Sequence, residues 1–340
     1  MTTRPRSATT SAWVVERPAP IASGPLRLVR RTTPEPGLHE LLLTVRACGV
    51  CRTDLHLAEG DLAPRTPRCT PGHEVVGEVL AAGPDVEDLR IGDRVGAAWL
   101  ARACGHCRHC RTARENLCPD SLYTGWDIHG GFAEHMLVDA RFAYRLPEGW
   151  DDEDAAPLLC AGIIGYRALQ RADVPPGGRL GIYGFGASAH LTAQLAIARG
   201  AEVHVVTRSS QAQRLALELG AASASAGVPP QPLDSAILFA PAGSLVPAAL
   251  DALDRGGTLA IAGIHLSAIP PLDYDRHLFQ ERTVRSVTAN TREDGRAYLA
   301  EAARLRPAVR VLRYGMQRAD QALTDLAGGR INGVAVLIMQ

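Results

Sequence analysis

The segment from Arg179 to Gly200 constrains the fold of this chain more than any other stretch. A short apolar strand runs into the pattern Gly184-x-Gly186-x-x-Ala189, and an alanine-rich helix follows until a glycine ends it. Glycines at such a turn let the backbone approach a pyrophosphate at the helix N-terminus, and a small third residue lets helix and strand pack closely. The pattern predicts a dinucleotide-binding turn with contacts from Gly184, Gly186, Ala187 and Ser188.

The sequence after this turn continues an alternation of strands and helices. Strands are predicted at 202–206, 234–239 and 258–262, with helices at 211–219 and 245–253 between them. This alternation is expected of a doubly wound parallel sheet. It favours the dinucleotide interpretation over a glycine turn in some other α/β protein.

The residues after the first of these strands bear on which dinucleotide binds. An NAD site usually carries Asp or Glu there for the ribose hydroxyls, whereas this chain has Thr207, Arg208 and Ser209. A carboxylate would repel a 2′-phosphate, but a hydroxyl beside a guanidinium would bind one. The segment favours NADP(H), and NAD(H) stays open because Arg208 could instead stack on adenine or face solvent.

Half of the eight cysteines lie in one loop, at 104–118. Two, two and seven residues separate Cys104, Cys107, Cys110 and Cys118. Four thiolates folded together form the tetrahedral cage that suits Zn²⁺, and a closed cage of this kind is structural. Disulfides are disfavoured because residues three apart on a tight loop pair poorly.

A second group of metal-binding residue types lies upstream. Residues 47–56 carry a thiol, a hydroxyl, a carboxylate and an imidazole, and residues 71–79 carry an imidazole and a carboxylate where a strand is predicted to begin. Thiolate, imidazole and a nearby carboxylate are what a catalytic zinc needs. The candidates are Cys51, Thr53, Asp54, His56, His73 and Glu74.

Composition excludes several kinds of chemistry. The 36 basic residues balance 36 acidic ones, so there is no broad positive field for nucleic acid. Every basic residue is arginine, which excludes a Schiff-base lysine and a phosphate-loop lysine. No run of about 18 apolar residues occurs and the N-terminus lacks an apolar signal core, so we expect a cytoplasmic protein without a membrane partner.

In their order along the chain, these motifs resemble the zinc-dependent medium-chain alcohol dehydrogenases. The triplet Gly72-His73-Glu74, the segment 48–54, the four-cysteine loop and the glycine fingerprint follow one another as in that family. The resemblance implies an α/β protein with a β-rich, GroES-like catalytic domain and a doubly wound Rossmann cofactor domain. The expected boundaries are 1–157 with 296–340 for the first and 158–295 for the second, with the active site between them.

The resemblance also implies the ligands of a catalytic zinc. Cys51, His73 and Cys160 are expected to bind it, two cysteines and one histidine being the known ligand set of alcohol dehydrogenases. Cys160 is included only because residues 156–166 look like the family's segment entering the cofactor domain. Glu74 is expected to approach the metal during ligand exchange, and Asp54 to orient His73.

The implied reaction is hydride transfer between a small primary or secondary alcohol, bound as its zinc alkoxide, and a nicotinamide cofactor. The proton is expected to pass from Thr53 through the cofactor ribose to His56. Arg52 resembles the basic residue that reaches the cofactor pyrophosphate. Further contacts are expected from Ile264 to the cofactor and from Trp99 and Trp126 to the substrate.

Two alternatives to this function stay open. One is a non-catalytic zinc- and nucleotide-binding sensor, which the zero net charge and the Thr53 and His56 pair disfavour. The other is a polyol or cinnamyl-type dehydrogenase of the same superfamily, which would differ mainly in pocket shape. A homotetramer is expected because the chain lacks the insertion after the cysteine loop that longer dimeric relatives carry.

Overall fold

The structure is a computed structural model that describes residues 9–339. The N-terminal segment, for which we expect no signal sequence, lies outside the described residues. The chain divides into two compact units. The first contains the described residues up to Cys160, the segment Thr291–Arg296 and the described residues from Arg310 onward, and the second contains Ala161–Asn290 and Ala297–Val309.

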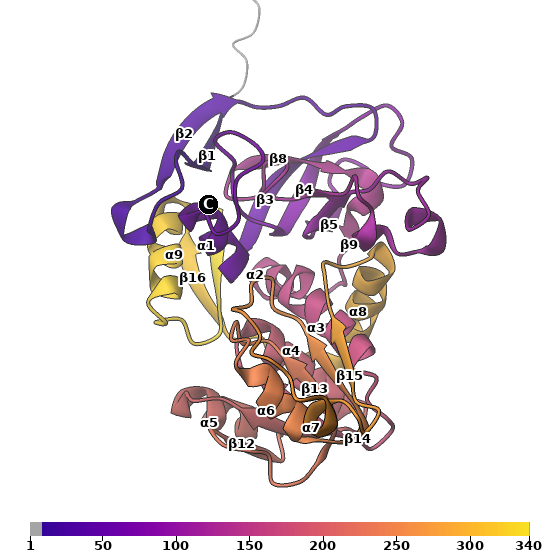
Figure 1. The fold of residues 1–340 in the computed structure, drawn as a ribbon. Helices are drawn as coiled ribbons and strands as arrows, with labels where there is room; N and C mark the ends of the chain where they lie inside the picture. The colour runs from indigo at the N-terminus through magenta and orange to yellow at the C-terminus, as the bar shows by residue number, and fades with distance from the viewer. Residues whose placement is uncertain (1–8, 340) are drawn as a thin grey trace, which may run out of the picture. The chain divides into compact units, whose positions relative to one another are not determined.

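The first unit is built on a seven-stranded sheet in which neighbouring strands are mostly antiparallel. Its strand order is β16-β17-β3-β4-β5-β9, and β8 also pairs with β3 (Figure 1). Strand β17 pairs with β3, so the end of the chain completes the sheet that the N-terminal part begins. A mainly apolar core that includes Leu41, Val75 and Phe132 holds this unit together.

The elements of the first unit alternate short strands with few helices. They are β1 (Thr9–Val15), β2 (Leu26–Thr32), β3 (Glu40–Val50), α1 (Arg52–Glu59), β4 (Glu74–Ala82), β5 (Arg94–Ala97), β6 (Leu100–Arg102), β7 (Leu122–Tyr123), β8 (His135–Asp139), β9 (Tyr144–Arg145), α2 (Asp152–Ala155), β16 (Val311–Gly315), α9 (Ala319–Ala327) and β17 (Val334–Ile338). This composition confirms the β-rich character expected of the unit.

The second unit contains a six-stranded, all-parallel sheet in the order β12-β11-β10-β13-β14-β15. From β10 the chain adds strands first on one side and then on the other. This strand order is typical of dinucleotide-binding sheets and confirms the predicted doubly wound fold. Its elements are α3 (Ala161–Ala172), β10 (Arg179–Tyr183), α4 (Ala187–Ala198), β11 (Glu202–Val206), α5 (Ser210–Glu218), β12 (Ser223–Ser225), β13 (Leu233–Leu238), α6 (Leu245–Asp251), β14 (Leu253–Ile261), α7 (Tyr274–His277), β15 (Thr283–Ser286) and the part of α8 (Arg292–Leu305) that follows Arg296.

Most predicted boundaries lie within one residue of the observed ones, and the larger differences are at the end of α6 and the start of β14. Helix α6 ends at Asp251, and β14 begins at Leu253 rather than Thr258. Strand β14 begins earlier because its ladder with β13 continues through Gly256 and Gly257 as an irregularity in register, with Gly256 at φ +74°.

The segment after residue 296 also differs from the expected return to the first unit. Tyr298 lies against helix α3, where a Cβ on Gly162 would be 2.1 Å from its ring, and Arg199 pairs with Glu301 at 2.6 Å. These contacts keep Ala297–Val309 with the second unit. Glu115 accepts hydrogen bonds from the backbone and guanidinium of Arg292, and this keeps Thr291–Arg296 with the first.

Candidate functional site

Four potential metal ligands meet in the first unit. Cys51 lies between β3 and α1, His73 and Glu74 lie where β4 begins, and Cys160 follows a short helical turn at Ala156–Leu159. One ligand atom from each of the four lies within 4.8 Å of those of the other three. The structure therefore brings together the residues that the resemblance implied as ligands, including Cys160.

The spacing of these atoms fits a tetrahedral zinc ion. Sγ of Cys51 lies 3.2 Å from Nε2 of His73. Around zinc, with Zn–S of about 2.3 Å and Zn–N of about 2.0 Å, these two atoms would be about 3.5 Å apart. Binding the ion requires only a small outward shift of the side chains.

His73 is oriented by a carboxylate on its far side. Its Nδ1 lies 3.3 Å from Oδ1 of Asp54, and both side chains are 1% exposed. Backbone N–H groups of Cys51 and Gly72 donate to the two carboxylate oxygens of Asp54 at 2.9 and 2.8 Å. Because Asp54 is held from both sides, Nε2 of His73 faces the thiols, as expected of a metal-binding imidazole.

The buried groups of this site are electrostatically suited to a cation. Burial raises the pKa of Glu74 well above its usual range, and the nearby charge of Cys51 adds to the effect. The Cys160 thiol hydrogen-bonds to Cys51, which lowers the pKa of Cys51 and raises that of Cys160. Oε2 of Glu74 is buried and has no hydrogen-bond partner among the described residues. A divalent cation would relieve this crowding of acidic groups.

The predicted proton-relay residues share helix α1. A capping box begins this helix: the Thr53 N–H donates to Sγ of Cys51 at 3.3 Å while Asp54 accepts from the Cys51 backbone. Thr53 is buried and His56 lies one turn later, with Nδ1 2.9 Å from Oδ2 of Asp61. Residues three apart lie on one face of a helix, so Thr53 and His56 share a face of α1. Of the two, Thr53 is the one that bonds to Cys51, an expected zinc ligand.

The four-cysteine loop forms the expected cage. Sγ of Cys110 lies 3.9 Å from Sγ of Cys104 and 3.5 Å from Sγ of Cys107, and the four ligand atoms lie within 4.8 Å of one another. Zinc bound by four thiolates places sulfur atoms about 3.8 Å apart. Backbone N–H groups of the loop donate to the sulfurs, and the one from Cys110 is the largest cause that lowers the pKa of Cys107 to about 7. None of the eight cysteines forms a disulfide.

Three aromatic rings, those of Trp99, Tyr123 and Trp126, form a wall beside His73. Their centroids lie 5.0 to 5.9 Å apart with interplanar angles of 11 to 27°. The ring of Trp99 meets that of His73 edge to face at 5.0 Å. The aromatic wall contains both expected substrate-pocket residues. Tyr123 was not predicted, and its spacing from Trp126 within one turn was the only local signal for it.

The predicted dinucleotide turn follows β10 in the second unit. Gly184 has φ +86°, and a Cβ on it would lie 2.9 Å from the backbone nitrogen of Ala240, so this position requires glycine. Gly186 caps α4, and space is open where its Cβ would be. Ala187 and Ser188 form the first turn of α4, whose N–H groups suit a phosphate.

The residues after β11 are arranged around the start of α5. Ser209 caps this helix, its Oγ accepting from the Ala212 N–H at 3.2 Å, and the Thr207 carbonyl accepts from the Gln213 side chain at 2.7 Å. Arg208 is exposed and has no ion-pair partner in the described part of the chain. Arg52 and Ile264, the other expected cofactor contacts, are exposed in the first and second units respectively.

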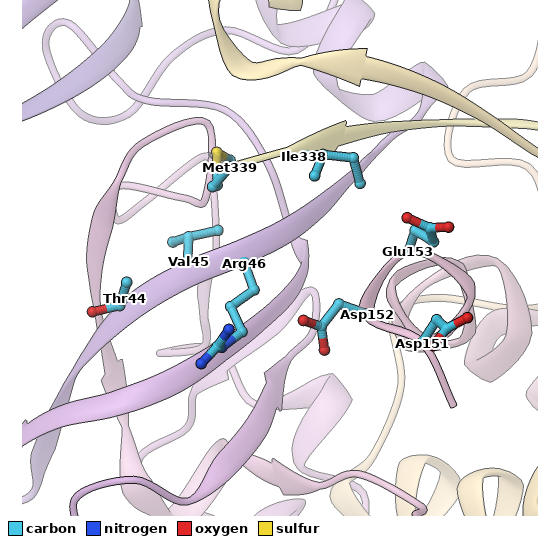
Figure 2. Close-up of a pocket in the computed structure, with 8 residues that line it drawn as sticks. All are labelled: Thr44, Val45, Arg46, Asp151, Asp152, Glu153, Ile338 and Met339. Carbon is cyan, nitrogen blue, oxygen red and sulfur yellow. The ribbon is translucent and has the colours of Figure 1, made fainter. Parts of the chain in front are cut away.

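A separate cavity of about 480 Å³ lies in the first unit (Figure 2). Arg46 pairs with Glu78, and Asp152 pairs with Arg94 at 2.6 Å. No candidate metal ligand borders this cavity, and Arg46, Asp152 and Glu153 each pair with a charged residue outside its lining, so we assign it no part in the site. Its lining residues are Thr44, Val45, Arg46, Asp151, Asp152, Glu153, Ile338 and Met339.

Comparison with known proteins agrees with this geometry. Residues 37–148 match the alcohol dehydrogenase GroES-like domain, and residues 189–304 match the zinc-binding dehydrogenase domain. "Probable alcohol dehydrogenase AdhA" of Mycobacterium tuberculosis is 58% identical over 98% of this chain and 98% of its own.

Two solved structures are similar along almost the whole chain. A cinnamyl alcohol dehydrogenase from Sorghum bicolor aligns with a TM-score of 0.87 at 27% identity, covering 97% of this chain and 98% of its own. A "putative zinc-binding dehydrogenase" from Sinorhizobium meliloti 1021, bound to NADP, aligns with a TM-score of 0.85 at 28% identity, covering 97% of this chain and 99% of its own.

The fold and the two clusters define a zinc-dependent oxidoreductase with a nicotinamide cofactor. The chain belongs to the zinc-containing medium-chain alcohol dehydrogenase family. It has a catalytic and a structural zinc site and acts on an alcohol or aldehyde with NAD(P). In the described part of the chain, no helix is both long and apolar enough to cross a membrane.

Proposed function

We propose that this dehydrogenase oxidises small primary or secondary alcohols and, in reverse, reduces the matching aldehydes or ketones. The observation that supports this best is the cluster of Cys51, His73 and Cys160, with Glu74 beside it. These three residues would hold the catalytic zinc. The structural zinc would be held by Cys104, Cys107, Cys110 and Cys118.

Zinc at such a site supplies a Lewis acid that lowers the pKa of the alcohol or polarises the carbonyl. The protein's own residues manage the proton. Thr53 would accept it at Oγ1, and His56, whose Nδ1 lies beside the half-exposed carboxylate of Asp61, would release it to solvent. Asp54 keeps Nε2 of His73 directed toward the cysteine thiols. Glu74 would approach the metal when its ligands exchange.

We also propose that NADP(H) is favoured and NAD(H) is accepted more weakly. Thr207, Arg208 and Ser209 put hydroxyls and a guanidinium where an NAD site usually carries a carboxylate. The exposed Arg208 has no carboxylate to neutralise it among the described residues, so it is available to a 2′-phosphate. The NADP-bound relative supports the same choice. Arg52 would contact the pyrophosphate, and Ile264 would lie at the cofactor.

Pocket shape, assembly and location complete the proposal. Trp99 and Trp126 would line the substrate pocket and keep it narrow. A homotetramer is proposed from the chain length, and scattering of the purified protein would test it. A cytoplasmic location is proposed because two thiol clusters must stay reduced to bind metal, and all eight cysteines are free thiols.

The test is a set of initial rates with primary, secondary, polyol and cinnamyl alcohols, using NAD⁺ and NADP⁺ side by side. The rates are measured before and after a zinc chelator, together with the zinc content per chain. We expect two zinc ions, loss of turnover with the chelator, and higher kcat/KM for small alcohols with NADP⁺. A preference for polyols or cinnamyl alcohol would overturn the substrate proposal, and a preference for NAD⁺ would overturn the cofactor proposal.

A further inference from the structure

Arg65 contacts one ring of the aromatic wall and a carboxylate that binds the backbone of a second ring residue. Its guanidinium carbon lies 4.0 Å from the centroid of the Trp126 ring. Its Nη1 lies 3.2 Å from Oδ1 of Asp127, whose other carboxylate oxygen accepts the backbone N–H of Tyr123 at 2.9 Å. One arginine therefore holds Trp126 directly and Tyr123 through Asp127.

The segment around Arg65 is fastened to the wall by two further hydrogen bonds. The indole Nε1 of Trp126 donates to the Ala63 carbonyl at 2.8 Å, and the Thr66 hydroxyl bonds to the Asp127 carbonyl. The Trp126 ring is thus held at its edge by Ala63 and over its face by Arg65. Trp99 stacks on both Tyr123 and Trp126, so its position beside His73 depends on theirs.

Arg65 occupies a favourable place for a residue that acts through others. Its side chain is 55% exposed, whereas the Asp127 side chain is 7% exposed. Replacing Arg65 leaves no hole in the core, and Asp127 keeps its bond to Tyr123. Loss of the arginine would mainly free the face of Trp126.

We infer that Arg65 is a positioning residue that holds Trp126 against Trp99 and Tyr123 and so keeps the space beside His73 narrow. A narrow space favours short, unbranched alcohols over bulky ones. This inference rests on the proposed alcohol oxidation. It assigns a specificity role to a residue that contacts the wall from a surface loop.

The first experiment compares ethanol with benzyl alcohol in Arg65→Met, Arg65→Lys and a control, Arg68→Met. Arg68 is a nearby exposed arginine that pairs with Glu16 at 3.1 Å. In Arg65→Met we expect the ratio of kcat/KM for benzyl alcohol to that for ethanol to rise about two- to fivefold, mainly through a lower KM for benzyl alcohol. Arg65→Lys should keep most of the wild-type ratio, and Arg68→Met all of it.

The variant Trp126→Ala distinguishes two ways in which the inference could fail. An unchanged ratio in Arg65→Met, with a raised ratio in Trp126→Ala, would show that Arg65 does not position the ring. An unchanged ratio in both would show that the wall does not limit substrate size. Either result overturns the inference.

A second readout needs no turnover. Acrylamide should quench the tryptophan fluorescence of the zinc-loaded protein more strongly in Arg65→Met than in Arg68→Met. The difference should vanish when both variants also carry Trp126→Phe. If wild type oxidises no alcohol, the proposed function fails, but quenching still reports whether Arg65 holds Trp126; equal quenching in the two variants would overturn that part of the inference.

Discussion

A Cβ atom on Gly49 would lie 1.9 Å from Oε2 of Glu74. The two residues pair across the ladder of β3 and β4, where the carboxylate folds back over the strand. Only glycine leaves room for it there. Gly49 therefore lets a buried carboxylate stay beside the catalytic zinc site, within reach of Cys51 and Cys160.

Gly49→Ala should disturb both stability and metal binding, because the new methyl group must displace Glu74. Overpacking of this kind costs about 2 kcal/mol of unfolding free energy. In a Glu74→Ala background part of that cost should disappear, because the carboxylate is gone although Cβ of residue 74 stays 2.8 Å from the new methyl group. Urea unfolding of the two single variants and the double variant measures the coupling, with zinc content followed in parallel. Purely additive effects would contradict the proposed conflict between Gly49 and Glu74.

Cys107→Ser should remove the structural zinc and leave the catalytic zinc in place. The cage needs four thiolates, and a hydroxyl is a poor ligand for zinc in a sulfur site. We expect metal analysis to fall by one zinc per chain, with a lower temperature of thermal inactivation. Arg108→Ala, an exposed change in the same loop, serves as the control. Unchanged zinc content in Cys107→Ser would contradict the assignment of the cage.

Arg208→Ala should weaken NADP⁺ selectively. A charge-assisted hydrogen bond to a phosphate contributes about 1.5–3 kcal/mol, so kcat/KM with NADP⁺ should fall about 10- to 100-fold. The value with NAD⁺ should change little, because NAD⁺ has no 2′-phosphate. Arg214→Ala on α5, also exposed, is the matched control. Equal losses with both cofactors would place Arg208 elsewhere than at the 2′-phosphate.

His129 should make the fold less stable in mild acid. Burial, followed by the charge of Arg31, lowers its pKa from 6.5 to about 4. The unfolded chain therefore gains a proton on His129 as pH falls below about 6.5, whereas the folded chain does so only near about 4. Stability is lost across this window as pH falls, by at most about 2 kcal/mol at pH 5 from this group.

His129→Asn should remove this part of the pH dependence. An asparagine oxygen can still accept the Thr70 N–H, which now donates to Nδ1 of His129 at 3.2 Å. Urea unfolding at pH 5 and pH 7.5 measures the difference for wild type, His129→Asn and the control His39→Asn, whose side chain is 47% exposed. If His129→Asn and wild type lose the same stability between the two pH values, the assignment to His129 is wrong.

Local sequence patterns were enough to predict a site wherever its motif is contained in a short stretch of chain. The four thiols lie within residues 104–118, so their spacing alone predicts a cage. The turn after β10 is similar, since the glycine pattern lies within one turn, where Gly184 has φ +86°. Spacing could not select Cys160; the family resemblance did, and the structure places its sulfur beside Cys51.

Only the tertiary structure showed what surrounds these motifs. Arg65 lies about 60 residues before the turn that contains Tyr123 and Asp127 and shares no sequence pattern with it, yet together they fix the rings beside His73. Gly49 lacks a local signal as well, because its need for glycine arises from Glu74 on the neighbouring strand. The type of metal ligand and the geometry of a turn are set by residues that are close together in the sequence, so both can be predicted from the sequence alone. The size of the pocket and the room for a carboxylate depend on sheet register and side-chain packing, which arise only when distant segments meet.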